Sequence, residues 1–359
     1  MMELKPRFLA TAVGSMPHED PARAVEVALE ALPEAPIWPQ LPKRGLNEQM
    51  EIQYSEGLPR RMIDREKGRM YFDTSGDYSE AFAEFYEAYM SAMDPDSGNG
   101  DCSAMAISPD YAAGIPALEQ RLAAAGGKRP FLKCHTTGPC SFALSIVDEN
   151  KRALYYNEEF RDLIVKALAM KSRWQIQRLK PYAERVICFV DEPILAGFGS
   201  STYVSVSRED VVAVIAEVID AIRQDGAIPG VHCCGNTEWS IPIDAGADII
   251  SFDAFQYGET IAIYPDHMRR LLEEGRALAF GLVPTSTQVR EQDVATLCAH
   301  YQKLVDLLAD KAGLSKALIH EQTLITGSCG TGTLSVEDAE RVFALSGELS
   351  RALRARHGF

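Results

Sequence analysis

The amino-acid sequence predicts an α/β fold, a single (β/α)8 TIM barrel whose active site lies at the C-terminal ends of the strands. Short apolar runs, about eight in number, alternate with longer amphipathic segments along the 359 residues. The alternative is a doubly wound open sheet. The sequence disfavours it because AVGSMPH follows the first run in place of a glycine-rich G-x-G-x-x-G turn. One domain, residues 1–359, is therefore expected.

The runs are short and mainly apolar, which is typical of strands buried on both faces. In chain order they are FLATAV (8–13), SAMAIS (103–108), PFLKCH (130–135), RVICFVD (185–191), IPGVHC (228–233), DIISFD (248–253), ALAFGL (277–282) and LITGSC (324–329).

The amphipathic segments carry helix start and stop signals. Asp20 precedes Pro21 as a candidate N-cap, and Ser207 with Asp210 forms a capping-box-like start to a helix that Gly226 ends. Helices are expected at 21–32, 78–93, 157–180, 207–226 and 336–356. The polar segment 44–75 is long for a strand-to-helix connection, and we expect it to cap the barrel rim.

Composition restricts the partners and the location of the protein. A net charge of −15 argues against a nucleic-acid partner, because phosphate binding needs a basic face. No run approaches the roughly 18 apolar residues that cross a membrane, and the first residues lack the apolar stretch of a secretory signal. The eight cysteines are dispersed through a long chain, which is typical of reduced cytoplasmic thiols rather than of a disulfide framework.

Residues able to bind metals or substrates recur at the ends of the expected strands. In a barrel these positions share one rim, so their common location is a stronger signal than any one of them. They are Gly14, Ser15, His135, Asp191, Glu192, His232, Cys234, Asp253 and Cys329.

A metal site is predicted around VHCCGN (231–236). His232 and Cys234 point to one side of a strand end because alternate residues share a face, whereas Cys233 points the other way. Cys329 can complete the set from the last strand, and Asp253 can add an oxygen ligand. Such a set of sulfur and nitrogen ligands indicates zinc. The alternative is a group of buried thiols and a core histidine.

Two further motifs indicate what the site binds. Asp191 and Glu192 in VDEP can accept hydrogen bonds from an ammonium group, although helix capping ahead of Pro193 explains them equally well. Gly14 and Ser15 offer backbone N–H groups to a carboxylate, or simply form a turn. A carboxylate cradle, an ammonium acceptor and a thiophilic metal together fit a simple amino-acid thiol such as homocysteine.

These motifs resemble the catalytic barrel of the cobalamin-independent methionine synthase family, within the superfamily that also contains methylcobamide:coenzyme M methyltransferases and uroporphyrinogen decarboxylase. The matching stretches are TAVGSMP (11–17), HTTGP (135–139), VDEP (190–193), HCCGNT (232–237) and the Cys-Gly pair at 329–330. The resemblance implies zinc on His232, Cys234 and Cys329, with Asp253 as fourth ligand. It also implies that Gly14 and Ser15 bind the homocysteine carboxylate and that Asp191, the expected catalytic residue, binds its amino group, with Glu192 beside it.

The departures from that family concern the methyl donor. The chain has room for one barrel, as in the short core methionine synthases, and TGPCSFALSI (137–146) lacks the tryptophan that packs on the folate. The other tryptophans, Trp38, Trp174 and Trp239, lie elsewhere in the sequence. The resemblance therefore implies a methylcobamide donor, either on a corrinoid carrier protein or as free methylcobalamin. His135 is a candidate for the donor side, and the alternative is a buried histidine at a strand end. A second substrate-binding glutamate has four candidates: Glu48, Glu56, Glu80 and Glu84.

Three alternatives remain open at this stage. Coenzyme M or another thiol can replace homocysteine as the acceptor, although a sulfonate without an amino group gives Asp191 nothing to bind. A decarboxylase-like enzyme needs no zinc and uses arginines near the N-terminus, for which Arg7, Arg44, Arg60 and Arg61 are candidates. A non-enzymatic module that binds a corrinoid protein or a thiol is the third.

Overall fold

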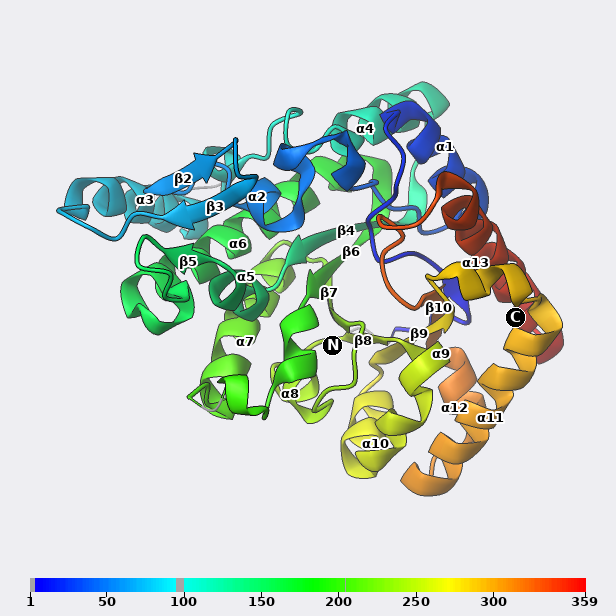
Figure 1. Ribbon diagram of the computed structural model, residues 1–359. Helices are drawn as coiled ribbons and strands as arrows, with labels where there is room; N and C mark the ends of the chain where they lie inside the picture. The colour runs from blue at the N-terminus through cyan, green and yellow to red at the C-terminus, as the bar shows by residue number, and fades with distance from the viewer. Residues whose placement is uncertain (1–3, 95–99, 204) are drawn as a thin grey trace.

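A curled sheet of seven parallel strands forms the centre of the molecule, and helices surround it (Figure 1). The computed structural model describes residues 4–94, 100–203 and 205–359. The strands run in the order β1-β10-β9-β8-β7-β6-β4. They are β1 (Leu9–Ala10), β4 (Arg129–Thr137), β6 (Ala183–Asp191), β7 (Ile228–Cys233), β8 (Ile249–Phe252), β9 (Ala277–Val283) and β10 (Thr323–Gly327).

Regular strands do not close this sheet into an eight-stranded barrel. Its two edges are β1 and β4, and between them the chain at 34–40 makes single parallel bridges, from Gln40 to Ser15 and from Ile37 to Lys133. Pro36 and Pro39 lie in this segment, and a proline cannot donate to a ladder of hydrogen bonds. The predicted barrel is thus confirmed as a curled parallel α/β sheet compatible with a TIM-like barrel, and the prediction of eight regular strands is wrong.

Seven of the eight predicted apolar runs contain strands of this sheet. The exception is SAMAIS (103–108), which begins with the 3-10 helix η4 (Ser103–Met105). Its alternation of small and apolar residues is short enough to suit either structure. No strand was predicted at 34–40, where two prolines interrupt the stretch.

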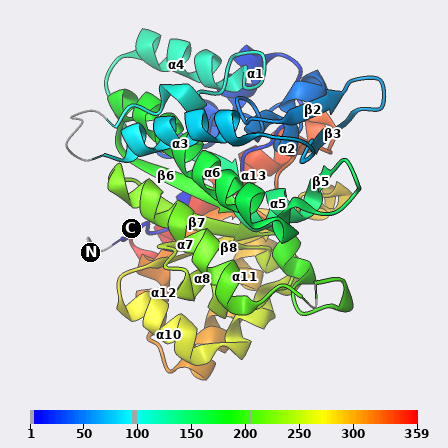
Figure 2. The ribbon, with the colours of Figure 1, turned by 90° about the vertical axis from the view of Figure 1, so that its left-hand side faces the viewer.

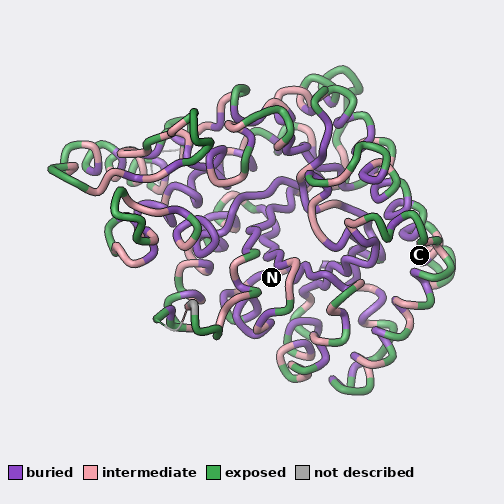
Figure 3. Tube along the Cα trace, in the orientation of Figure 1, coloured by how far each residue is buried: buried purple, intermediate pink, exposed green. Residues whose placement is uncertain are grey.

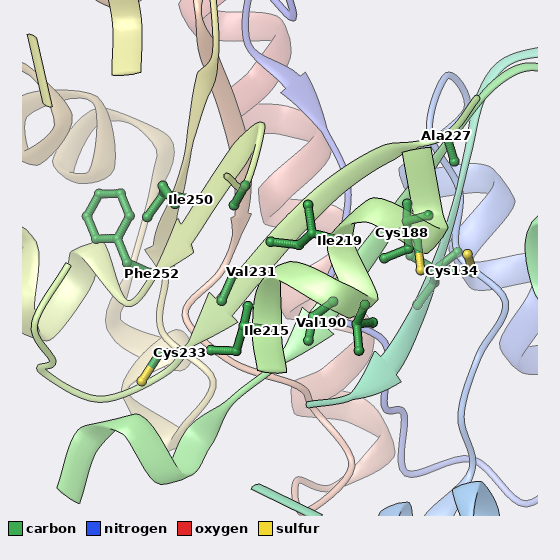
Figure 4. Packing of buried hydrophobic residues seen from close by; sticks show 14 of the residues in the cluster. Cys134, Cys188, Val190, Ile215, Ile219, Ala227, Val231, Cys233, Ile250 and Phe252 are labelled. Atoms are coloured by element: carbon green, nitrogen blue, oxygen red, sulfur yellow. The ribbon is translucent and has the colours of Figure 1, made fainter. Parts of the chain in front are cut away.

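The side chains of each strand alternate between the lumen and the layer of helices. Figure 4 shows Cys134, Cys188, Val190, Val231 and Cys233 on the helix side, packed with Ile215 and Ile219. The positions between them face the lumen, whose lower part is a separate apolar cluster formed by Leu9, Ile187, Phe189, Ile228, Ile249, Ala277, Ala279 and Leu324, among others. Burial is accordingly greatest along the strands and least at the peripheral helices (Figure 3).

The five predicted helices are present. α1 (Pro21–Ala31) begins after an N-cap at Asp20, and α7 (Arg208–Gln224) begins after Ser207. The others are α3 (Ser79–Met93), α6 (Glu158–Leu179) and α13 (Val336–His357). Further helices are α2 (Met50–Tyr54), α4 (Gly114–Ala125), α5 (Pro139–Ser145), α8 (Ser240–Asp244), α9 (Ala254–Tyr257), α10 (Pro265–Glu273), α11 (Val294–Ala312) and α12 (Lys316–Glu321).

Segment 44–75 forms α2 and a hairpin of β2 (Arg61–Asp64) and β3 (Arg69–Phe72), which joins β5 (Val147–Asp148) in a three-stranded sheet. In Figure 2 this small sheet lies on the side opposite the two chain termini, which is the side of the strands' C-terminal ends. Tyr54 of α2 donates a hydrogen bond to the carbonyl of His135 near the end of β4. The segment therefore lies on the expected side of the barrel, and its capping role and the single-domain division remain predictions.

None of the helices in the described ranges combines the length and the apolar character that crossing a bilayer requires.

Candidate metal and thiol site

Three predicted metal ligands meet at the rim of the lumen. His232 at the end of β7, Cys234 just beyond it and Cys329 after β10 bring their ligand atoms within 4.8 Å of one another. The histidine is buried, and the two cysteines are partly exposed. Residues almost a hundred positions apart in the sequence therefore converge on one point that solvent can reach.

His232 is held in a definite orientation. Its Nδ1 lies 3.0 Å from the hydroxyl of Ser251 on the neighbouring strand β8. Its Nε2 is buried and has no partner among the described residues. A ring nitrogen that is oriented by a hydrogen bond at one side and unpartnered at the other is the arrangement of a histidine metal ligand.

The two cysteines form a coupled pair of thiols. The Cys329 thiol and the His232 ring lie close to Cys234, and together they lower the pKa of Cys234 to about 4. The same interaction raises the pKa of Cys329 above its ordinary value. One thiolate is thus stabilised at neutral pH, and thiolate is the form in which cysteine binds metals.

Cys233 is separate from this group. Its side chain points into the layer between β7 and the helices (Figure 4), and burial raises the pKa of its thiol to about 12. The expectation that Cys233 would not join the cluster agrees with this placement.

Asp253 occupies a structural position. It is the N-cap of α9, where its Oδ1 accepts the backbone N–H of Gln256 at 2.8 Å. Burial raises the pKa of its carboxyl group to about 6. The three converging ligands do not include it, so its role as a fourth ligand remains a prediction that would need one carboxylate to serve two purposes.

Asp191 is the acidic group of the lumen. It is paired in register with His232 on β7 and with Thr137 on β4. It is buried, and its Oδ1 has no hydrogen-bond partner among the described residues. Burial raises its pKa to about 6, and the nearby Lys133 opposes that rise. A buried carboxylate oxygen that accepts no hydrogen bond, beside a metal-ligand set, is suited to receive a cationic group.

Lys133 is a buried cation that the sequence reasoning missed. Its side chain is fully buried in the lumen, donates to the carbonyl of Val13 and lies 4.5 Å from the ring centroid of Phe189. Burial lowers its pKa to about 8. A lysine inside an apolar strand run, as in PFLKCH, was the available signal, because lysine is almost never fully buried without a partner.

Glu192 is fully occupied by local hydrogen bonds. Its carboxylate accepts the backbone N–H groups of Cys140 and Ser141 at 2.8 and 2.7 Å, and the Ser141 hydroxyl at 2.7 Å. It thereby caps the N-terminus of α5. The expected part of Glu192 in substrate binding would require these bonds to break, so the carboxylate available in VDEP is that of Asp191.

The candidates for a second glutamate fall into two groups. Glu48 accepts from the Leu41 N–H and from Arg44, and Glu56 accepts from the backbone and hydroxyl of Ser108. Glu80 and Glu84 are exposed on α3.

Gly14 and Ser15 lie against the loop that carries Cys329. The Ser15 carbonyl accepts from the N–H and hydroxyl of Thr331, and its hydroxyl accepts from the Gly332 N–H at 3.2 Å. A Cβ added at Gly330 would approach the Ser15 hydroxyl to 2.1 Å. The predicted carboxylate turn is therefore adjacent to a metal ligand, and it also fixes that ligand's loop.

His135 lies beside the same turn. Its ring stacks on Trp38 with a centroid separation of 4.3 Å, and a Cβ at Gly14 would approach it to 2.5 Å. Both ring nitrogens are buried and unpartnered within the described residues, and burial holds the pKa of His135 well below its ordinary value. Trp38, which is remote in the sequence, is thus brought to the site by segment 34–40.

Three of the four arginines suggested for a decarboxylase are paired with carboxylates. Arg7 pairs with Glu321, Arg44 with Glu48 and Arg60 with Asp73, at 3.6, 2.8 and 2.7 Å. Arg61 donates to the Ser55 hydroxyl and lies over the ring of Tyr111.

The donor set fits zinc. One imidazole nitrogen and two sulfurs, one of them a stabilised thiolate, match the ligands of catalytic zinc sites, which keep a further position for substrate. The unpartnered Nε2 of His232 gives the same indication independently, because an orphaned buried nitrogen is costly unless a ligand satisfies it.

Comparisons with known proteins bear on the fold. No family model matches the sequence, and no curated protein sequence matches it significantly. Among solved structures, the B12-independent methionine synthase from Shewanella sp. W3-18-1, in complex with selenomethionine, is similar with a TM-score of 0.56 and 11% identity, covering 97% of this chain and 98% of that chain. A methyltransferase from Methanosarcina mazei gives a TM-score of 0.55 at 11% identity, with 97% and 99% covered. The chain therefore shares its fold with both over nearly the whole length of each.

Proposed function

We propose that the protein is a zinc-dependent S-methyltransferase that moves a methyl group to the thiol of homocysteine, with a methylcobamide as the donor. The observation that carries this proposal is the convergence of His232, Cys234 and Cys329 beside Asp191, whose buried Oδ1 has no hydrogen-bond partner among the described residues. A thiophilic metal set and an acceptor for an ammonium group, on neighbouring strands, suit one small molecule that carries both a thiol and an amine. The fold shared with a methionine synthase and with a methyltransferase supports the same reaction class.

Different residues would bind the thiol end and the amino-acid end of the substrate. Zinc held by His232, Cys234 and Cys329 would supply an open coordination position that lowers the pKa of the substrate thiol. Asp191 would accept the ammonium group, and the N–H groups of the Gly14–Ser15 turn would receive the carboxylate. Fixing the amino-acid end in this way orients the sulfur toward the donor and removes rotational freedom before transfer.

The donor assignment depends on the aromatic residues of the site. Trp38 is close, but it is fully buried, its face is covered by His135 and its indole N–H donates to Gln175 at 2.8 Å. It therefore offers no free face on which a pterin could stack. A methyl group already activated on cobalt needs no such platform, and the partly exposed Cys234 and Cys329 leave the metal position open to a large donor.

A methyl-transfer assay tests the proposal. Zinc-loaded protein is given L-homocysteine with either methylcobalamin or methyltetrahydrofolate, and methionine is measured. We expect methionine from methylcobalamin and none above background from methyltetrahydrofolate. Asp191→Ala should raise the KM for homocysteine much more than it changes kcat.

Three other outcomes of this assay would contradict the proposed donor, the proposed acceptor or the proposed metal. Efficient turnover with methyltetrahydrofolate would show that the donor assignment is wrong. Methylation of coenzyme M as fast as that of homocysteine would favour the alternative acceptor. An active protein from which all metal has been removed would exclude the zinc mechanism.

A further inference from the structure

Several buried polar atoms without a hydrogen-bond partner lie at the end of the lumen that is formed by the C-terminal ends of the strands. Among the described residues they include both ring nitrogens of His135, Thr137 Oγ1, Asp191 Oδ1, His232 Nε2 and Thr326 Oγ1. All five residues lie at or near the C-terminal ends of strands. Each such atom costs about 1–3 kcal/mol when neither water nor a ligand satisfies it, so a group of them in one place is suited to bind a polar ligand.

Three of these residues form a row across neighbouring strands. Thr137 on β4 is in register with Asp191 on β6, and Asp191 is in register with His232 on β7. Their side chains share the lumen face, because Cys134, Val190, Val231 and Cys233 point outward (Figure 4). The fractional exposures of Thr137, Asp191 and His232 are 0, 7 and 3%. The row thus runs from His232, a predicted metal ligand, to the hydroxyl of Thr137, which has no role assigned so far.

The row of side chains can bind a cation next to the Asp191 carboxylate, on the side of Thr137. Adjacent strands lie about 4.8 Å apart, so a group bound by Asp191 can also reach the neighbouring Thr137. An ammonium group has three N–H donors, and a single carboxylate oxygen satisfies only part of them. The threonine hydroxyl supplies a second acceptor on the side away from the metal.

A purely structural role for Thr137 does not account for its hydroxyl. In the described residues Oγ1 makes no hydrogen bond. Valine has the same shape and a higher preference for buried strands, so packing alone would favour valine at this position. The preceding Thr136, by contrast, donates to the carbonyl of Thr137 at 3.3 Å.

We infer that Thr137 is a specificity-determining residue that binds the amino group of the acceptor thiol together with Asp191, and so selects amine-bearing thiols over simple ones. This inference rests on the proposed function, because it assumes that the thiol end is held at His232, Cys234 and Cys329. It adds a residue that discriminates between acceptors.

Binding measurements on the zinc-loaded protein test it. Calorimetric titration compares L-homocysteine with 4-mercaptobutyrate, which has the same thiol and carboxylate but lacks the amine. We expect Thr137→Val to bind homocysteine about ten- to a hundredfold more weakly, as the loss of a hydrogen bond to a charged group implies, and to bind 4-mercaptobutyrate unchanged. Thr137→Ser keeps the hydroxyl and should retain the preference for homocysteine.

Thr136→Val is the matched control, because it removes a hydroxyl from the neighbouring outward-facing position. It should affect both thiols equally and little. Thermal melts establish that each variant is folded, and Thr137→Ala provides the same comparison if the valine variant does not fold.

The failures are distinguishable. Homocysteine binding that is unchanged in Thr137→Val, or binding of both thiols weakened equally, would overturn the inference and leave the proposed function standing. If neither thiol binds the zinc-loaded wild-type protein, the proposed function and the inference are both wrong.

Discussion

Cys234 and Cys329 form the thiol pair at the rim, and their surroundings differ from those of Cys233, which precedes Cys234 in the sequence. Cys329 lies close to Cys234 and stabilises its thiolate, whereas Cys233, one residue away, is buried among apolar side chains. The difference comes from strand alternation and not from the chemistry of cysteine itself. Substitution of Cys234 or Cys329 should therefore lower the metal content, and substitution of Cys233 should leave it unchanged.

We expect Cys234→Ser and Cys329→Ser each to lower bound zinc from about one per chain to a small fraction, because a catalytic site holds zinc with only three protein ligands. Cys233→Ser is the matched control and should retain the metal while losing some stability through its buried hydroxyl. Elemental analysis of purified protein measures the zinc. Equal loss of zinc in all three variants would contradict the ligand assignment.

Gly14 links backbone conformation to the site. Its φ of +155° and the 2.5 Å approach of a Cβ to His135 both disfavour any side chain. We expect Gly14→Ala to lower the free energy of unfolding by about 2 kcal/mol or more, since overpacking adds to backbone strain. Gly45→Ala provides the comparison, because Gly45 has a φ of +149° and nothing lies near its Cβ.

The difference between the two glycine variants in urea denaturation isolates the contact with His135. If Gly14→Ala and Gly45→Ala lose the same stability, the ring of His135 does not restrict position 14.

At the scale of elements, capping residues were the most reliable sequence signals. Asp20 and Ser207 both accept backbone N–H groups at the starts of α1 and α7, as their positions before the helices predicted. We expect Ser207→Ala to destabilise the protein by about 1 kcal/mol, as measured by urea unfolding. Ser207→Asp should restore most of the loss, and a variant that aspartate cannot rescue would show that the hydroxyl has another role.

The sequence also located the strand ends that carry the site, because short apolar runs between helices are typical of strands buried on both faces. It could not show that Trp38 stacks on His135, or that Glu192 caps α5 instead of facing the lumen. Both depend on segments that meet only in the folded chain. Motif spacing identified His232 and Cys234, which lie at the end of one strand. Contacts between different strands could be predicted only with the register of the whole sheet.

At the scale of the whole molecule, buried cations make stability depend on pH. Lys171 in α6 is fully buried and donates to the carbonyls of Glu56 and Met105 at 2.6 and 3.4 Å. Burial lowers its pKa from 10.5 to about 7. Between these values the unfolded chain holds a proton that the folded protein has released, so this group makes stability rise as pH increases from about 7 toward 10.

We expect the stability difference between wild type and Lys171→Met to change by a few kcal/mol in favour of wild type between pH 6.5 and pH 9.5, since one pKa unit is about 1.4 kcal/mol. Urea denaturation at each pH measures this. Lys128→Met, at an exposed position, should show no such trend. A parallel course for Lys171→Met and wild type would mean that the buried lysine is not the source.

The join between β1 and β4 has a consequence for how the site responds to motion. Single bridges and a few backbone hydrogen bonds hold segment 34–40 to β1 and β4, and Pro36 and Pro39 contribute no N–H groups. The wall around the lumen therefore lacks a regular ladder of hydrogen bonds at this seam, and Trp38, which stacks on His135, is part of the seam. Movement of the seam would be transmitted through that stacked pair to the mouth of the lumen.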